Sequence, residues 1–206
     1  MGNDMKQIEL GRTGLMVSDW CLGTMTFSTQ TPAQDAHRQI DMCLDAGINF
    51  LDTAEMYPVN PMRKGTVGNS ERCIADWLAA SGRRDDVVIA TKAGGDSALI
   101  RGGEGFSGDN ILDVLDGNLD RLGTDYIDLY QLHWPMRGSY CFRQNWTYDP
   151  SGQDRAAVID HMSGVLEKLK KAQAAGKIRA FGLSNETAWG TTKWIDIAEE
   201  IGAPRV

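Results

Sequence analysis

The rest of this sequence is arranged around one segment, Ile48-Asn49-Phe50-Leu51-Asp52-Thr53-Ala54-Glu55-Met56-Tyr57. It opens with a short apolar run that is long enough for a buried strand, and it ends abruptly in polar residues. The acid Asp52 at that boundary would lie at the mouth of a sheet or barrel, and the phenol of Tyr57 follows five residues later.

Two later strand-like runs end in the same way, with a polar side chain at the boundary. Residues 87–92 end at the amine of Lys92, and residues 126–133 end at the imidazole of His133. If these strand ends share one face, the amine and the imidazole meet the acid and the phenol of the first segment in one pocket.

Length, composition and charge limit the class of protein. A chain of 206 residues indicates one domain, or at most two small ones, and 42% hydrophobic with 24% charged residues is typical of a soluble globular protein. The net charge of −7 argues against a nucleic-acid or anionic-membrane surface, which would need a basic face. The N-terminus does not resemble a signal peptide, and no apolar run approaches the ~18 residues of a membrane span.

The cysteines and histidines do not follow a metal-site pattern. The four cysteines are scattered without a CxxC pair, and the three histidines are dispersed. We therefore expect no metal site, and we expect reduced thiols in a cytoplasmic protein.

Turn and cap signals divide the chain into alternating strands and helices. Residues 6–10 and 15–18 flank a Gly-Arg-Thr-Gly turn and predict a hairpin, and residues 17–22 predict a first strand of the main sheet. Thr31, followed by Pro32, is expected to cap the first helix. The second helix is expected to be capped by Ser70, a third to begin near Asn110, and successive helices to end at Gly47, Gly82, Gly123, Gly176 and Gly202.

This alternation predicts an α/β fold with a parallel sheet and helices packed outside it. The residues that end the second to fifth strands, Asp52, Lys92, His133 and Ser184, are 40, 41 and 51 positions apart by subtraction. Such a rhythm, with polar loops inserted on one side, favours a single domain over residues 1–206 built as a (β/α)8 barrel. A doubly wound sheet is the rival architecture, because five strands would suffice for it.

The segment Gly103-Glu104-Gly105-Phe106-Ser107-Gly108 has the glycine spacing of a dinucleotide-binding fingerprint. That fingerprint requires its glycines immediately after a strand, whereas the preceding strand is expected to end about ten residues earlier. We therefore interpret this segment as a flexible loop that leads into a helix.

Each of the four polar residues also has an ordinary interpretation. Asp52 could bond a turn, Tyr57 could belong to a plain loop, Lys92 could extend to solvent and His133 could lie hydrogen-bonded at the rim of the core. Their shared topological place favours joint chemistry instead. An ammonium is expected to lower the pKa of a neighbouring phenol, and a carboxylate would hold that ammonium in place.

An imidazole beside this set could donate a hydrogen bond to a carbonyl oxygen and so orient a substrate. The four groups together could protonate a carbonyl oxygen while hydride arrives at the carbon. They do not form the arrangement that acyl transfer requires, and they are not the paired carboxylates of glycoside hydrolysis.

From Ile8 to its last residue the sequence resembles the aldo-keto reductases. The resemblance rests on five ordered motifs: Gly23-Thr24-Met25-Thr26-Phe27, residues 49–57, Ala90-Thr91-Lys92, residues 119–135 and residues 176–186. Residues 54–61 look most like the bacterial Tas branch of that family. The resemblance implies a (β/α)8 TIM barrel with an N-terminal β-hairpin that closes its bottom, truncated here after about five βα units.

The resemblance also implies NADPH-dependent reduction of an aldehyde or ketone, with NAD not excluded. By position, Tyr57 would be the general acid and Lys92 the group that lowers its pKa. Asp52 would be the partner of Lys92, and His133 would orient the carbonyl of a small-molecule substrate. The family usually has glycine after this tyrosine, and Pro58 in that place would reshape the substrate pocket.

Five residues are expected at the cofactor. By position in the family, Thr24 and Met25, together with Asp52, would approach the nicotinamide and ribose. Ser184 and Asn185 would hydrogen-bond the carboxamide. The family's main adenosine and phosphate contacts come from sequence beyond residue 206, so these residues do not separate NADP from NAD.

Several alternatives remain open at this stage. A nucleotide-sensing regulatory subunit or an inactive fragment would carry the same motifs. We expect either a fragment of a longer protein or a chain that self-associates and binds NADPH weakly. Residues 134–153 carry five aromatic side chains, and we expect at least one of them to line the carbonyl pocket rather than only pack on the rim.

Overall fold

The structure, a computed structural model, describes residues 5–206 and contains a small antiparallel sheet and a larger parallel one. The small sheet pairs β1 (Gln7–Glu9) with β2 (Met16–Ser18). The strands of the larger sheet lie side by side in chain order, and every neighbouring pair is parallel. They are β3 (Cys21–Gly23), β4 (Phe50–Asp52), β5 (Val88–Ala93), β6 (Ile127–Leu132) and β7 (Ile178–Leu183).

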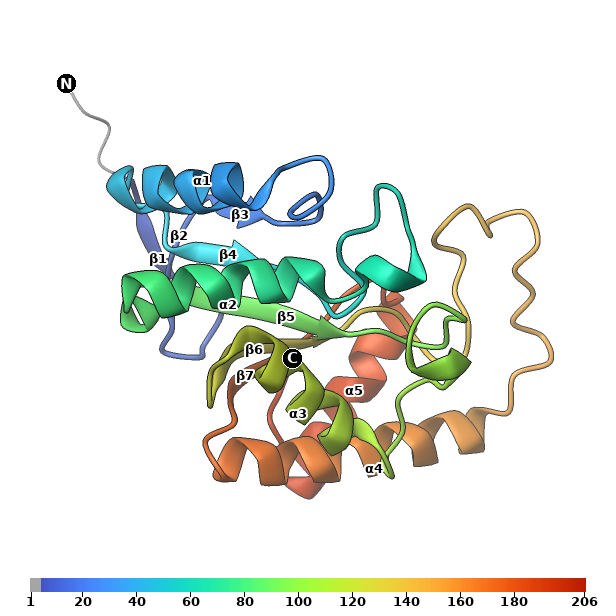
Figure 1. The fold of residues 1–206 in the computed structure, drawn as a ribbon. Coiled ribbons are helices and arrows are strands. Elements are labelled where there is room, and N and C mark those ends of the chain that lie inside the picture. The colour runs from blue at the N-terminus through green and yellow to red at the C-terminus, as the bar shows by residue number, and fades with distance from the viewer. Residues whose placement is uncertain (1–4) are drawn as a thin grey trace.

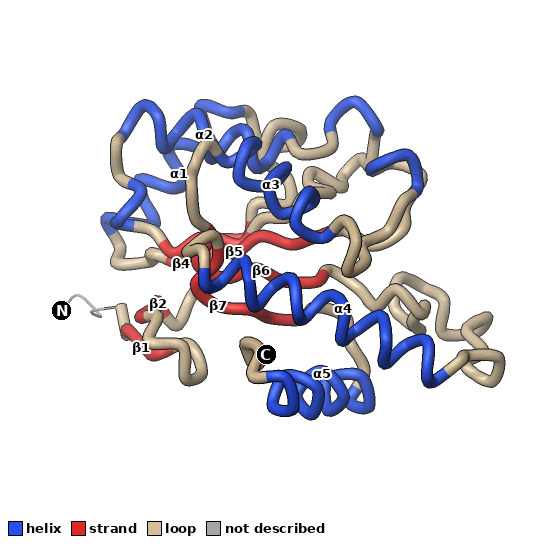
Figure 2. The backbone as a smooth tube through the Cα atoms, turned by 90° about the horizontal axis from the view of Figure 1, so that it is seen from below, coloured by secondary structure: helices blue, strands red, loops and turns tan. Residues whose placement is uncertain are grey.

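One long helix follows each strand of the larger sheet. These helices are α1 (Ala33–Asp45), α2 (Asn69–Ser81), α3 (Ile111–Leu122), α4 (Arg155–Ala174) and α5 (Ala188–Ile201). They follow the curve of the sheet from α1 to α5 (Figure 2). None of the helices within residues 5–206 is both long and apolar enough to cross a membrane.

The strand order separates the two architectures that the sequence left open. A doubly wound sheet changes direction at a switch point, whereas here the chain adds each new strand on the same side of the last. With right-handed crossovers, that order places every helix on one face of the sheet. The prediction of consecutive βα units from a (β/α)8 barrel is therefore confirmed, and β3 and β7 form the two edges of the described sheet.

The two faces of the sheet carry different side chains. On the outer face, Thr91 and Tyr130 point towards the helices, where their hydroxyls donate to Glu71 of α2 and Asn118 of α3. Apolar residues of the strands and helices surround these bonds and form the core. The neighbouring strand positions point to the other face, because successive side chains alternate. That inner face carries the polar groups described below.

The two ends of the sheet also differ. The arrows of β4 and β5 point to the end where the long loops gather, and the hairpin lies at the opposite end (Figure 1). Asn49, just before β4, holds the hairpin there: its Oδ1 accepts from Ser18 N at 2.8 Å and its Nδ2 donates to Met16 O at 3.2 Å. The predicted hairpin at the bottom of the barrel is confirmed.

Three local predictions were wrong, each because a hydroxyl found a different partner. Residues 17–22 are not one strand, since Ser18 Oγ donates to Trp20 O and the chain bends between β2 and β3. Thr31 does not cap α1, because its hydroxyl pairs with that of Thr26 and Pro32 is the N-cap. Ser70 lies inside the first turn of α2 and donates to carbonyls of the loop after β3.

We predict that Asn49→Ala lowers the free energy of unfolding by about 2 kcal/mol, because it leaves the buried main chain of Ser18 without its acceptor. Urea denaturation would measure the loss. Gln7→Ala is the matched control, since it removes a single exposed bond to Gly47 O and is expected to cost about 0.5 kcal/mol or less. Equal losses in both variants would contradict the assigned role of Asn49.

Candidate active site

A buried ion pair lies on the inner face of the sheet, near the ends of β4 and β5. The Lys92 ammonium is almost fully buried, and its Nζ lies 2.7 Å from Asp52 Oδ2 and 2.8 Å from Thr53 O. Gln131 of β6 approaches the same carboxylate, with Nε2 at 3.3 Å from Oδ1. A buried ammonium needs such acceptors, because it has lost its hydration.

Tyr57 and His133 complete the cluster. Lys92 Nζ lies 4.9 Å from the centroid of the Tyr57 ring. The Tyr57 and His133 rings meet edge to face, with centroids 5.6 Å apart. The structure therefore brings Asp52, Tyr57, Lys92 and His133 together at the loop-bearing end of the sheet.

The pKa of Tyr57 differs in direction from our expectation. Burial and the Asp52 charge raise the pKa of the phenol to about 12, whereas we expected Lys92 to lower it. The ammonium lies over the face of the ring, and its hydrogen bonds go to Asp52 and Thr53. At neutral pH the phenol is fully protonated, which is the form that a general acid requires.

His133 is neutral for a related reason. Burial, and to a lesser degree the Lys92 charge, lowers the pKa of the imidazole to about 3. Its Nδ1 is buried and has no partner among the described residues. A neutral imidazole carries one donor and one acceptor, and the unpartnered Nδ1 is one of these two groups. The ring can therefore donate one hydrogen bond to a ligand without carrying a charge.

Four further residues with predicted cofactor contacts lie at the same end. Thr24 is buried and its hydroxyl donates to Asp52 O at 3.0 Å, while Met25 is partly exposed at the rim. Ser184 follows β7, and its main-chain N donates to Leu132 O. Asn185 has φ 54° and donates its side-chain amide to His133 O and to Ser184 Oγ.

These side chains fit the carboxamide of a nicotinamide. The bonds of the Asn185 side chain within residues 5–206 use only its NH2 group, which leaves its carbonyl oxygen as an acceptor. The Ser184 hydroxyl accepts from Asn185 and keeps its own proton to donate. A donor and an acceptor side by side match the two functions of an amide.

Comparison with known proteins agrees with this geometry. The sequence profile of the Aldo/keto reductase family matches residues 20–203. This chain belongs to the aldo/keto reductase family.

Individual relatives match 87–98% of the chain but are themselves longer. Protein tas of Escherichia coli is 40% identical over 98% of this chain and 58% of its own length. The 6-dehydroglucose reductase of Novosphingobium aromaticivorans is 32% identical over 87% and 51%. An aldo-keto reductase from Bacillus halodurans, in its holo form, superposes with a TM-score of 0.64 at 31% identity, over 87% of this chain and 50% of that one. The chain thus spans little more than half the length of these relatives.

Two site residues of this aldo/keto reductase were not predicted from the sequence. Gln131 lies in β6, two positions before His133, and the two-residue alternation of β6 could have placed it on the inner face. Glu55 is buried beside Tyr57 and bonds Gly94 N, yet an acid in a loop carries no such signal in the sequence alone.

The glycine-rich segment has a packing role. A Cβ at Gly108 would lie 2.9 Å from the carbonyl carbon of Gly164 in α4, and one at Gly105 would lie 1.9 Å from Met136 Cε. Helix α3 begins only at Ile111, and the segment does not follow β5 directly. Its interpretation as a loop, and not as a dinucleotide fingerprint, is confirmed.

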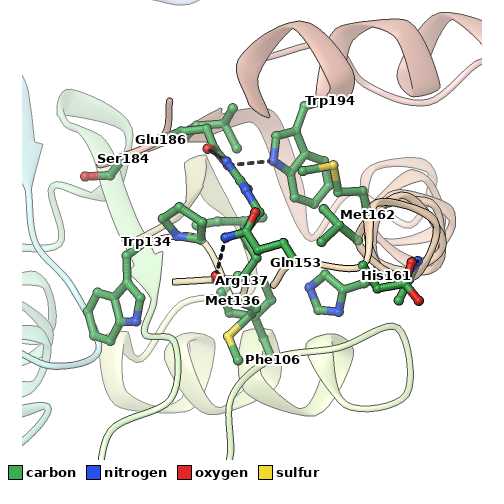
Figure 3. A pocket seen from close by; sticks show the side chains of 16 residues that line it. Phe106, Trp134, Met136, Arg137, Gln153, His161, Met162, Ser184, Glu186 and Trp194 are labelled. Carbon is green, nitrogen blue, oxygen red and sulfur yellow. Dashed lines mark hydrogen bonds and ion pairs between the residues drawn. The ribbon is translucent and has the colours of Figure 1, made fainter. Parts of the chain in front are cut away.

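The loop after β6, residues 134–153, adds aromatic side chains next to His133. Trp134 packs against His133 with centroids 4.9 Å apart and ring planes tilted by 43°, and Phe142 meets Trp134 edge to face at 5.7 Å. Behind Trp134, between this loop, α4 and α5, lies a pocket of about 310 Å³. Trp134 and Ser184 lie on one side of it and His161 and Met162 on the other (Figure 3).

We predict that His133→Gln reduces the loss of stability on acidification. In the unfolded chain the imidazole of His133 binds a proton below its ordinary pKa of 6.5, whereas in the folded protein it does so only near pH 3. The free energy of unfolding is therefore not reduced by this residue above pH 6.5, and it falls as the pH drops below that value. Near pH 5 the decline amounts to about 2 kcal/mol. Denaturant unfolding between pH 7 and pH 5 would measure it, and parallel slopes for the two proteins would contradict the neutral assignment.

Proposed function

We propose that this chain is the catalytic portion of an NADPH-dependent reductase that converts an aldehyde or ketone to an alcohol. The observation that carries the proposal is the convergence of a protonated phenol and a neutral imidazole on one point of the rim, above a buried ammonium–carboxylate pair. The relative named 6-dehydroglucose reductase and the holo aldo-keto reductase support the same reaction class.

Each residue of the cluster has one task in this reaction. His133 donates a hydrogen bond to the carbonyl oxygen, which orients the carbonyl and draws electron density away from its carbon. Tyr57 then transfers its proton to that oxygen as negative charge develops there. The Lys92 ammonium stabilises the phenolate left behind, and Asp52 holds the ammonium in place.

The cofactor would be held by residues at the same rim. When bound, the dihydronicotinamide supplies the hydride that reaches the carbonyl carbon. Ser184 and Asn185 would hold its carboxamide through the donor and acceptor described above, and so would favour one face of the ring towards the substrate. Thr24, Met25 and Asp52 would lie towards its ribose.

We predict that Tyr57→Phe in the complete enzyme lowers kcat for carbonyl reduction by ~10²–10⁴-fold, because no other group replaces the proton donor. NADPH affinity should change little. Turnover is followed by NADPH oxidation, and affinity by quenching of protein fluorescence. Tyr126→Phe is the matched control, since that phenol bonds Asp85 at the opposite end of the sheet. Near-normal turnover of Tyr57→Phe would refute the assignment.

We predict that Phe142→Ala changes the relative rates among carbonyl substrates, because Phe142 packs on the Trp134 ring that covers His133. Aromatic aldehydes should lose kcat/KM by more than short aliphatic ones. Trp146→Ala is the control, since Trp146 is 91% exposed. A uniform loss across both substrate classes would assign a purely structural role to the loop.

A further inference from the structure

A second carboxylate lies buried next to the acid–base cluster and is not used by the chemistry above. Glu55 stands two residues before Tyr57 in the loop after β4, and only 4% of its surface is exposed. Burying a carboxylate is costly unless charged or hydrogen-bonding partners surround it. The partners of Glu55 therefore indicate what its charge is needed for.

Glu55 ties the loop that carries Tyr57 to the strand that carries Lys92. Its main-chain N donates to Lys92 O at 3.1 Å, and its Oε2 accepts from Gly94 N at 2.9 Å. The general acid and the group that stabilises its phenolate are thus connected through one residue, which contacts the chain on both sides of Ala93.

The counter-ion of Glu55 comes from the glycine-rich loop. The Arg101 guanidinium forms an ion pair with Glu55 Oε2 and donates to Gly94 O. Arg101 has φ 44°, and the positive φ values of Gly102 and Gly103 turn the loop back over this contact. Arg101 lies two residues before the segment that resembled a dinucleotide fingerprint, and it presents a cation to the side of Glu55 that faces this loop.

Helix α3, on the outer face of the sheet, places a second arginine near the same carboxylate. Arg121 of α3 lies 3.9 Å from Glu55 Oε1 and donates its Nε to Glu71 at 2.6 Å. The fully buried Glu71 also accepts from Thr91 and Asn118. Glu55 therefore sits between two arginines, one on a loop and one on a helix.

We propose that Glu55 is a positioning residue that fixes Tyr57 against Lys92 and His133, with Arg101 as the cation that holds it there. The inference rests on the proposed function and adds a residue to it. Glu55 touches neither the carbonyl nor the cofactor. Its effect is on the placement of the phenol, so its loss should lower kcat more than it raises the KM for NADPH.

The test uses Glu55→Gln in the full protein, because glutamine keeps an acceptor for Gly94 N and removes only the charge that holds Arg101. We expect kcat to fall by up to ~10²-fold, as for small misplacements of reacting groups, with the NADPH KM within about twofold. Arg101→Ala should reproduce the loss, and Arg101→Lys should restore part of it. Asp116→Asn, which removes a half-exposed ion pair with Lys177, is the control.

A second readout does not depend on turnover. The nuclear Overhauser effect between the Tyr57 and His133 rings, whose centroids lie 5.6 Å apart, should weaken in Glu55→Gln and Arg101→Ala and persist in the control. Lowered stability with an unchanged ring contact and unchanged kcat would overturn the proposal. If the parent protein reduces no carbonyl but the ring contact still weakens, the positioning role stands and the proposed function fails.

Discussion

The ion pair between Lys92 and Asp52 is the contact on which the inner face of this sheet depends. A lysine ammonium inside a sheet is tolerated only when its charge is matched and its protons are bonded, and here a carboxylate and a main-chain carbonyl supply both. The same Asp52 accepts from Gln131 through its side chain and from Thr24 through its main chain. The charged pair therefore joins β4, β5 and β6 near their carboxyl ends, and the main-chain carbonyl of Asp52 ties Thr24, just after β3, to the same place.

Burial shifts the pKa values of the two rings beside that pair in opposite directions. It disfavours ionisation, so it raises the pKa of Tyr57 and lowers the pKa of His133, and both rings are neutral at physiological pH. A protonated phenol can release a proton, and a neutral imidazole can donate a hydrogen bond without repelling the nearby ammonium. The site thus combines one fully charged pair with two uncharged hydrogen-bonding rings.

The sequence allowed most of the fold to be predicted, because strand ends with Asp52, Lys92, His133 and Ser184 recur with a regular spacing. Helix caps were less predictable, since hydroxyls such as that of Ser70 bond loops that are distant in the sequence. The pKa direction of Tyr57 was also missed, because proximity to an ammonium can be inferred from topology but the degree of burial cannot. Glu55 was missed for a similar reason, as its partners lie on a separate loop.

The buried carboxylate of Glu71 has a consequence for the dynamics of the chain. It accepts hydrogen bonds from β5 and α3 while itself belonging to α2, so separating any of these three elements breaks a hydrogen bond to a carboxylate in the core. They should open together, as one cooperative unit in amide hydrogen exchange. The exposed loop around Trp146 has no such tie and should exchange its amide protons far earlier. The loop around Trp146 can then rearrange on a timescale separate from that of the three elements that share Glu71.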